Sequence, residues 1–400
     1  MTPRPQEPHL LAYAAVSSLV LAHDADAQSV APNYWKWAAD AHSAMGSALL
    51  DSEEPGIRAQ ASIIAANPRD DGACRQLVKE LERVFADSAD TPASARLVAL
   101  AQEVESSSRL LTHFGSPTGY ETPAPTADVL LGSIVRRPHH GTHPVDAAVV
   151  IPFRAAQNAR DRVRNLAAVL NALADQSHPR DRYRVVVVES DAQAQWRELF
   201  ADACDHYVFA PSPGPFNKSW TVNVGVVHGA SPAELICVLD GDILVDHHFI
   251  ERAVERFGHC GTQAHWPYRD MLFLDEHASA RASTRRCLDG APQVDSEDLR
   301  GVWLRRPPGG CVWLRESLFQ RLAGMDERFV GWGGEDEDFV WRVERHGVMD
   351  RHDDPLVHLH HSRAPHKAEG DVPFYDKVED LAFCTWPFDA EIGRLDRYVK

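Results

Sequence analysis

The sequence lacks long hydrophobic runs, paired cysteines and an excess of positive charge. Its longest apolar run, Leu10 to Ala22, has 13 residues and contains polar positions, so it is too short to cross a bilayer. The seven cysteines are scattered and never form a Cys-x-x-Cys pair, which predicts neither a zinc ribbon nor a disulfide framework. With 41 Lys and Arg against 58 Asp and Glu, the net charge is −17. This charge excludes nucleic acid and anionic membranes as general partners, and an anionic ligand would need a local cation or a metal.

These absences predict a cytoplasmic protein with reduced thiols and no stable membrane insertion. A secretory signal peptide is the rival interpretation of the apolar run, because Ala25 and Ala27 are the small residues that a cleavage site uses. The segment before the run argues against it. Its single arginine, Arg4, is balanced by Glu7, whereas signal peptides carry a positive patch there.

The first 115 residues predict a helical region. Apolar positions recur at helical spacing between Cys74 and Phe85, with charged residues on the opposite face. Thr91-Pro92 is a typical helix start, and the second helix is expected to end near Gly115. Two roles stay open for this region: it forms a homo-oligomer, or it caps the binding cleft of the domain that follows.

Residues 116–144 are rich in proline and glycine, which predicts an extended connector with at most one short strand around Val129 to Val135. Residues 145–400 then alternate β-branched runs with helical patterns, as a mostly parallel α/β sheet requires. The expected strands are Ala147–Phe153, Tyr183–Val188, His206–Ala210 and Leu235–Leu239, and the expected helices include Leu166–Leu173 and Ser219–Gly229.

Two aspartates follow the last of these strands. In open α/β sheets ligands bind beyond the carboxyl ends of strands, which is where Asp240-Gly241-Asp242 falls. Gly241 permits a tight turn that directs both carboxylates to one point, and hard oxygen ligands suit Mg²⁺ or Mn²⁺. The plain alternative is an Asp-Gly turn, which is common after a strand.

A second acidic cluster is Trp332-Gly333-Gly334-Glu335-Asp336-Glu337-Asp338, which opens an amphipathic stretch ending at Gly347. The helix dipole favours acidic residues in the first turn of a helix, so capping is the simple interpretation. The paired glycines also permit close approach of a ligand, and a carboxylate there could accept a proton from an alcohol. Trp332 offers a flat face for a sugar ring, although a buried core tryptophan is as common.

Two further segments carry candidate ligands. His358, His360 and His361 lie close enough in sequence to share a metal with a distant carboxylate, whereas a surface histidine patch is the alternative. In the segment Phe216-Asn217-Lys218, Phe216 could stack on a base and Lys218 could neutralise a phosphate. Asn223, five residues later, could bind a ligand or satisfy helix backbone.

Together these motifs resemble a GT-A glycosyltransferase. The resemblance is to the core shared by inverting β-1,4-galactosyltransferases and chondroitin-polymerase-like members of glycosyltransferase family 2, and it covers Val145 to Lys367. It implies a Rossmann-like sheet with helices on both faces, a divalent metal (Mn or Mg) and a UDP-sugar donor.

The resemblance also implies roles for individual residues. Asp242, His361 and His358 would bind the metal, and Asp336 would be the catalytic base. The residues implied at the nucleotide are Pro152, Arg154, Phe216, Asn217, Lys218, Asn223, Asp240 and Asp242, while those implied at the acceptor are Gly310, Trp332, Gly333 and Glu335. A second basic residue of the first-strand motif is replaced by Ala156, and Glu189 is expected to take over its contact.

The implied reaction is inverting transfer of a hexose, with glucose the favoured one, to a small polar acceptor such as a validoxylamine-like aminocyclitol. Glu335, Glu337 and Asp338 would suit an amine-bearing acceptor, although solvated charges on a helix face are the common explanation of such residues. Transfer to a polysaccharide or glycan acceptor, a nucleotidyltransferase and a non-catalytic sugar-binding scaffold remain alternatives.

Overall fold

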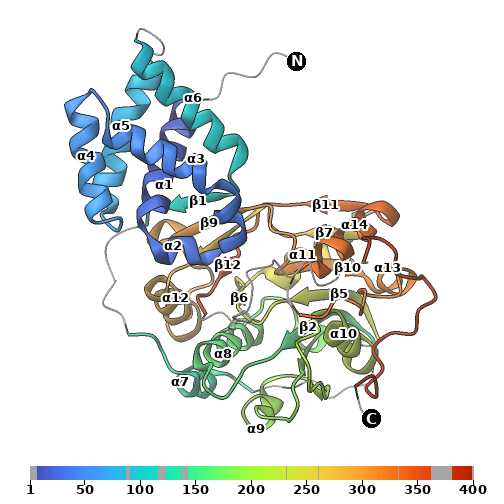
Figure 1. The fold of residues 1–400 in the computed structure, drawn as a ribbon. Helices are drawn as coiled ribbons and strands as arrows, with labels where there is room; N and C mark the ends of the chain where they lie inside the picture. Colours follow the sequence, from blue (N-terminus) through green and yellow to red (C-terminus); the bar gives the residue numbers. More distant parts are fainter. Residues whose placement is uncertain are drawn as a thin grey trace. The chain divides into compact units, whose positions relative to one another are not determined.

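The computed structural model describes residues 7–86, 91–115, 123–136, 138, 143–230, 232–259, 261–331, 333–361 and 381–398. The chain divides into two compact units (Figure 1). The first comprises Met1–Thr122, Asp270–Arg281 and Asp295–Arg306, and the second the remaining segments. This division differs from the predicted boundaries, because two segments assigned to the domain 145–400 are part of the first unit.

The first unit packs helices around α1. Its helices are α1 (Pro8–His23), α2 (Ala25–Val30), α3 (Pro32–Leu50), α4 (Pro55–Ala66), α5 (Asp71–Ala86) and α6 (Pro92–Ser107), and α12 (Glu276–Ser283) begins in it. α1 is buried along most of its length, which explains the apolar run at Leu10 to Ala22. The predicted helix at Cys74 to Phe85 is confirmed as α5. No described helix has both the length and the apolar character needed to span a membrane.

Three antiparallel strands complete this unit and correct one prediction. Strand β1 (Leu110–His113) pairs with β9 (Gly301–Arg305), which pairs with β8 (Asp270–Leu274). The helix expected to reach Gly115 therefore ends at Ser107. Leu110 pairs with Leu304, almost 200 residues away, and a partner this distant leaves no signal in the local pattern.

The second unit is built on a seven-stranded, mostly parallel sheet with helices on both faces, as predicted. Its strand order is β11 (Met349–Arg351), β7 (Ala264–Trp266), β10 (Cys311–Arg315), β5 (Ala233–Leu239), β2 (Val145–Phe153), β3 (Tyr183–Glu189) and β4 (His206–Phe209). The run β5-β2-β3-β4 is parallel, and β10 is antiparallel to both of its neighbours. The four strands expected from the sequence are β2 to β5.

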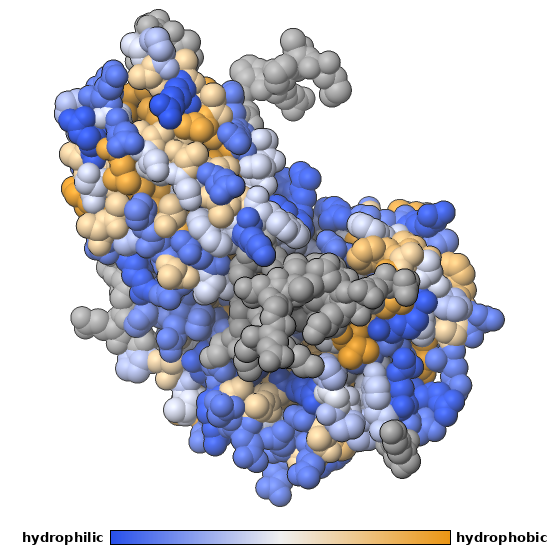
Figure 2. All heavy atoms as spheres, in the orientation of Figure 1, coloured by the Kyte–Doolittle hydropathy of each residue, from blue (hydrophilic) through white to orange (hydrophobic). Residues whose placement is uncertain are grey.

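The two faces of this sheet are covered by different helices. One face packs against α10 (Lys218–Gly225), α13 (Glu316–Arg321) and α14 (Glu335–His346), through apolar residues that include Val150, Trp220 and Phe339. The other packs against α8 (Arg160–Ala174) and α11 (Phe249–Phe257), where Tyr183 donates to the Leu173 carbonyl. Short α9 (Arg197–Phe200) precedes β4. On the face drawn in Figure 2, the coloured residues are largely hydrophilic, with apolar residues interspersed among them.

The connector corrects a second prediction. Where a short strand was expected around Val129 to Val135, the chain forms helix α7 (Ala127–Ser133). The Thr126 side chain caps this helix by accepting a hydrogen bond from the Val129 amide. A side-chain cap stabilises the first turn, so it outweighs the β-branched residues in so short a segment.

Arg300 provides a test of the first unit. Its guanidinium is buried, 3.3 Å from Asp24 and 3.5 Å from Asp71. Arg300→Met would leave two buried carboxylates without this cation, and we expect the free energy of unfolding to fall by about 3–5 kcal/mol. Arg69→Met, which breaks the exposed pair with Asp26, should cost less than about 1 kcal/mol. Equal losses in chemical denaturation of the two variants would contradict this account.

Candidate active site

One end of the seven-stranded sheet brings an aspartate and two histidines together. Asp242 lies just beyond β5, and the short pair β6 (Ile243–Leu244) and β12 (Val357–His358) places His358 opposite Ile243. His358 Nε2 is 3.5 Å from one Asp242 carboxylate oxygen, and His361 Nε2 is 3.2 Å from the other. The three side chains offer ligand atoms that lie within 4.8 Å of one another. This is the convergence that the resemblance implied.

The chemistry of these three residues fits a divalent cation. Burial would raise the pKa of Asp242, but the imidazoles of His358 and His361 lower it well below its ordinary value, so the carboxylate is ionised. Its Oδ1 is buried and accepts no hydrogen bond from the described residues. Mg²⁺ prefers oxygen ligands alone, whereas imidazole suits transition metals, so two histidines with one carboxylate favour Mn²⁺ over Mg²⁺.

His360 is held differently from its neighbours. Its carbonyl oxygen accepts hydrogen bonds from Arg164 at 3.2 Å and Asn165 at 3.0 Å, both on α8. These bonds fix the backbone between the two cluster histidines. The side chains that gather at Asp242 are thus those of His358 and His361, which separates the three candidates that the sequence could not.

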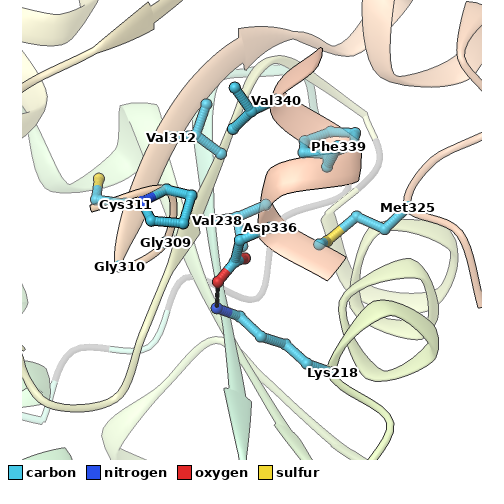
Figure 3. A pocket seen from close by; sticks show the side chains of 11 residues that line it. Lys218, Val238, Gly309, Gly310, Cys311, Val312, Met325, Asp336, Phe339 and Val340 are labelled. Carbon is cyan, nitrogen blue, oxygen red and sulfur yellow. Dashed lines mark hydrogen bonds and ion pairs between the residues drawn. The ribbon is translucent and has the colours of Figure 1, made fainter. Parts of the chain in front are cut away.

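A buried lysine joins the two acidic motifs. Lys218 Nζ is 2.8 Å from Asp240 and 3.0 Å from Asp336, and its side chain is 10% exposed. Figure 3 shows Lys218 and Asp336 pointing toward each other in a pocket that Gly309, Gly310 and Cys311 also line. Burial alone would lower the pKa of Lys218, but the surrounding carboxylates raise it well above its usual value. The lysine is therefore a fixed positive charge.

Glycines make room for Asp336 in the first turn of α14. Gly334 precedes the helix with φ 89°, a conformation that L side chains rarely adopt, and Gly333 has φ 105°. A Cβ atom at Gly309 would overlap Asp336 Oδ2. Gly310, with φ 111°, accepts a hydrogen bond from the Asp240 amide at 2.9 Å. The glycines of both motifs thus let backbone and carboxylates meet at one point.

The four consecutive carboxylates of α14 have different environments. Burial, followed by the charge of Asp336, raises the pKa of Glu335 to about 8. Asp338 is fully buried, pairs with Arg342 at 2.8 Å and accepts from the Cys384 amide. Asp338 therefore faces the protein interior, and the expectation that it would contact an amine-bearing acceptor is wrong.

The residues expected at the nucleotide divide into two groups. Pro152 ends β2 with Phe153, and Arg154 follows it, donating to the Gly214 carbonyl and pairing with Asp191 at 3.2 Å. Phe216 is half-buried beside Lys218. Glu189 instead accepts from the Gln195 and Trp196 amides and from the Tyr207 hydroxyl. Its carboxylate is engaged by the loop that follows β3 and by Tyr207 of β4, so the structure gives it an internal role.

The two asparagines also turn inward. Asn217 caps α10 by accepting from the Trp220 amide, and its amide donates to the Glu327 carbonyl. Asn223 donates to the Met325 carbonyl and to the Glu327 carboxylate at 3.0 Å. Both residues therefore shape the segment that carries Lys218. Trp332 lies outside the described residues.

Glu327 is a residue that the sequence analysis missed. It is 1% exposed, and its carboxylate accepts from Asn223, from the Gly393 amide and from Arg397 at 2.7 Å. It thereby fastens the segment 391–398 to α10. A lone Glu in a loop has no periodicity or spacing that could have shown this role.

Comparison with known proteins gives one family match. Residues 303–368 match the family model described as the N-terminal domain of galactosyltransferase. This segment contains Gly310, the acidic turn of α14 and both histidines of the metal cluster. The match agrees with the glycosyltransferase class that the sequence motifs implied. No curated protein matches the chain.

Several solved structures are similar to this chain at low identity. S. aureus TarS is 14% identical with a TM-score of 0.40, and the match covers 54% of this chain and 60% of TarS. The mannosyltransferase PcManGT of Pyrobaculum calidifontis, solved with GDP-Man and Mn²⁺, is 16% identical with a TM-score of 0.35, covering 56% and 59%. The Drosophila β1,4-galactosyltransferase 7 catalytic domain is 15% identical with a TM-score of 0.35, covering 63% and 83%. This chain thus covers less than two thirds of the length of the TarS and PcManGT chains.

The metal cluster can be tested by titration calorimetry with Mn²⁺ alone. We expect Asp242→Asn and His361→Ala each to weaken Mn²⁺ binding by about tenfold or more, because each removes one of the three ligands. His360→Ala is the matched control and should bind as the unaltered protein does. Equal binding by all of these proteins would contradict the assignment.

Glu335 predicts a pH dependence of stability. Its folded pKa of about 8 exceeds the ordinary value of 4.5. Between these two values the folded state keeps a proton that the unfolded state releases. The contribution of Glu335 to folding stability is therefore full below about pH 4.5 and is lost as the pH rises to 8. Glu335→Gln removes the cost of ionising a buried carboxyl. The melting temperature of this variant should therefore rise relative to that of the unaltered protein as the pH increases from 5 to 8. Glu255→Gln, on the exposed side of α11, should show no such trend. If the melting temperatures of Glu335→Gln and of the unaltered protein change with pH in parallel, the prediction is wrong.

Proposed function

We propose that this protein is a metal-dependent inverting glycosyltransferase that moves a hexosyl group from a UDP-sugar to an acceptor hydroxyl. The observation that carries the proposal is the continuity of the site. Asp242 of the metal cluster is two residues from Asp240, and Lys218 links Asp240 to Asp336. The proposed cation site and the proposed base are therefore connected through Asp240 and Lys218 at one end of the sheet.

The donor's diphosphate leaving group requires positive charge in an otherwise acidic protein. A divalent ion held by Asp242, His358 and His361 would supply Lewis-acid stabilisation of that group. Lys218 adds a fixed cation between Asp240 and Asp336. Arg154 and Phe216, at the carboxyl end of the sheet, are the proposed contacts of the nucleotide.

Asp336 is the proposed general base. Its carboxylate is 23% exposed, so a hydroxyl can reach it, and its Oδ2 lies 3.0 Å from Lys218 Nζ. It would take the proton of the acceptor hydroxyl as that oxygen attacks the anomeric carbon and the bond to the diphosphate breaks. A single displacement of this kind inverts the configuration. Glu335, protonated at neutral pH, can donate a hydrogen bond to a sugar hydroxyl.

The finer proposal concerns the substrates. Glucose as donor sugar and an aminocyclitol as acceptor rest on the sequence resemblance. With Asp338 turned into the interior, Glu335, Asp336 and Glu337 are the acidic groups of this turn left to meet such an acceptor. Gly310, Gly333 and Trp332 complete the acceptor side of the proposal.

Asp336→Asn tests the proposed base. The amide cannot accept the proton, so we expect transfer to fall by about 10²–10⁴-fold. UDP affinity in the presence of Mn²⁺, measured by calorimetry, should change little because the metal cluster is intact. Asp353→Asn, at a side chain that is 66% exposed, is the control. Undiminished transfer by Asp336→Asn would exclude this residue as the base.

A further inference from the structure

A buried tyrosine contacts the glycine turn of the candidate active site. Tyr268 follows the end of β7 by two residues and is 1% exposed. Its hydroxyl accepts a hydrogen bond from Trp266 Nε1 at 3.0 Å and donates one to the Gly309 carbonyl. An indole N–H can only donate and a carbonyl oxygen can only accept, so the direction of both hydrogen bonds is fixed. Tyr268 and its two partners all belong to the second unit.

The tryptophan that donates to Tyr268 is anchored in the sheet. Trp266 is 2% exposed and is the last residue of β7, where it pairs with Arg351 of β11. The Arg351 guanidinium lies over the Trp266 ring, 4.7 Å from the centroid, and the Trp266 carbonyl accepts from the His352 amide at 2.9 Å. The indole N–H therefore reaches the Tyr268 hydroxyl from a fixed position.

The turn that accepts from Tyr268 has little torsional restraint of its own. Gly309 and Gly310 lack side chains, and Gly310 adopts φ 111°. A Cβ atom at Gly309 would lie 1.9 Å from Asp336 Oδ2, and Figure 3 shows the turn beside this carboxylate. The Gly310 carbonyl accepts from the Asp240 amide at 2.9 Å. A rotation of the peptide between the two glycines would therefore change the space around Asp336.

The Tyr268 hydroxyl keeps its proton in this environment. Burial, followed by the influence of Cys311, raises the pKa of Tyr268 well above its ordinary value, and Asp336 and Asp240 add to the shift. A phenol donates a hydrogen bond only while it is protonated. The bond to the Gly309 carbonyl therefore persists across the neutral pH range.

We infer that Tyr268, oriented by the Trp266 indole, is a positioning residue for the proposed base Asp336. It acts through the Gly309 carbonyl, which it holds so that the glycine turn stays against the carboxylate. The turn then forms one wall of the space in which an acceptor hydroxyl meets Asp336. Tyr268 lies in none of the sequence motifs that predict the site. This inference deepens the proposed function and rests on it for its activity readout.

The test compares Tyr268→Phe with the matched control Tyr183→Phe. Both tyrosines are 1% exposed and donate to a backbone carbonyl, but Tyr183 begins β3, at the opposite end of the parallel strands from Asp240. With UDP-glucose as donor and a validoxylamine aminocyclitol as acceptor, Tyr268→Phe should lower kcat/KM for the acceptor by about tenfold or more, because small displacements of reacting groups are costly. Tyr183→Phe should stay within about twofold. UDP affinity with Mn²⁺ should stay within about twofold in both variants, a split that general destabilisation would not produce.

Amide hydrogen exchange supplies a readout that needs no activity. Peptides that contain residues 309–311 should exchange faster in Tyr268→Phe than in the unaltered protein or in Tyr183→Phe. Trp266→Phe removes the N–H that orients the hydroxyl, so it should show a smaller increase of the same kind, and it keeps the inference testable if Tyr268→Phe does not fold.

The two readouts separate the inference from the proposed function. If the unaltered protein transfers no glucose to this acceptor, the proposed function fails for these substrates while the exchange data still decide the role of Tyr268. Unchanged exchange of the 309–311 peptides in folded Tyr268→Phe or Trp266→Phe would overturn the inference. Unchanged kcat/KM in an active Tyr268→Phe enzyme would overturn it as well.

Discussion

The candidate active site depends on compensation of negative charge. Asp240, Asp242, Glu335 and Asp336 gather at one end of a sheet in a protein whose net charge is already −17. Lys218 balances Asp240 and Asp336, and the two histidines lie against Asp242. At Glu335, burial and the charge of Asp336 outweigh the attraction of Lys218, so Glu335 keeps its proton. The four carboxylates thus differ in their neighbours, and these differences underlie the proposed roles.

The same arrangement explains why several motif residues face inward. Asn217, Asn223 and Glu327 hold α10 and the segment 391–398 together, and Lys218 is the first residue of that helix. Asp338 likewise fixes α14 through Arg342, two residues after Asp336. Groups that look like ligands in the sequence therefore serve the placement of the few that face the site.

The sequence predicted the elements whose signal is local. The β-branched runs of β2 and β3, and the amphipathic pattern of α5, were recognisable because burial imposes a period on them. The cluster of Asp242, His358 and His361 was also predictable, since Asp242 follows a strand and the two histidines belong to a recognised motif. Gly333 and Gly334 belong to the motif at 332–338, and they precede a helix whose first turn carries the proposed base.

Other features could not be predicted because their causes are distant in the chain or depend on a single side chain. β1 exists through its pairing with β9, and Arg109 and Arg300 contact partners that are separated from them by about 200 residues or more. α7 depends on a single threonine cap. Glu189 is a residue type suited to a ligand, and only its three hydrogen bonds, from the loop after β3 and from β4, show its internal role.

The most direct test of the central claim is the release of nucleoside diphosphate from a panel of UDP-sugars by the intact chain, with Mn²⁺ and after chelation. The account predicts that at least one UDP-sugar yields UDP, that Mn²⁺ is required, and that the sugar is transferred with inverted configuration when an acceptor is present. Release of pyrophosphate in place of UDP, or UDP release that is unaffected by chelation, would contradict it.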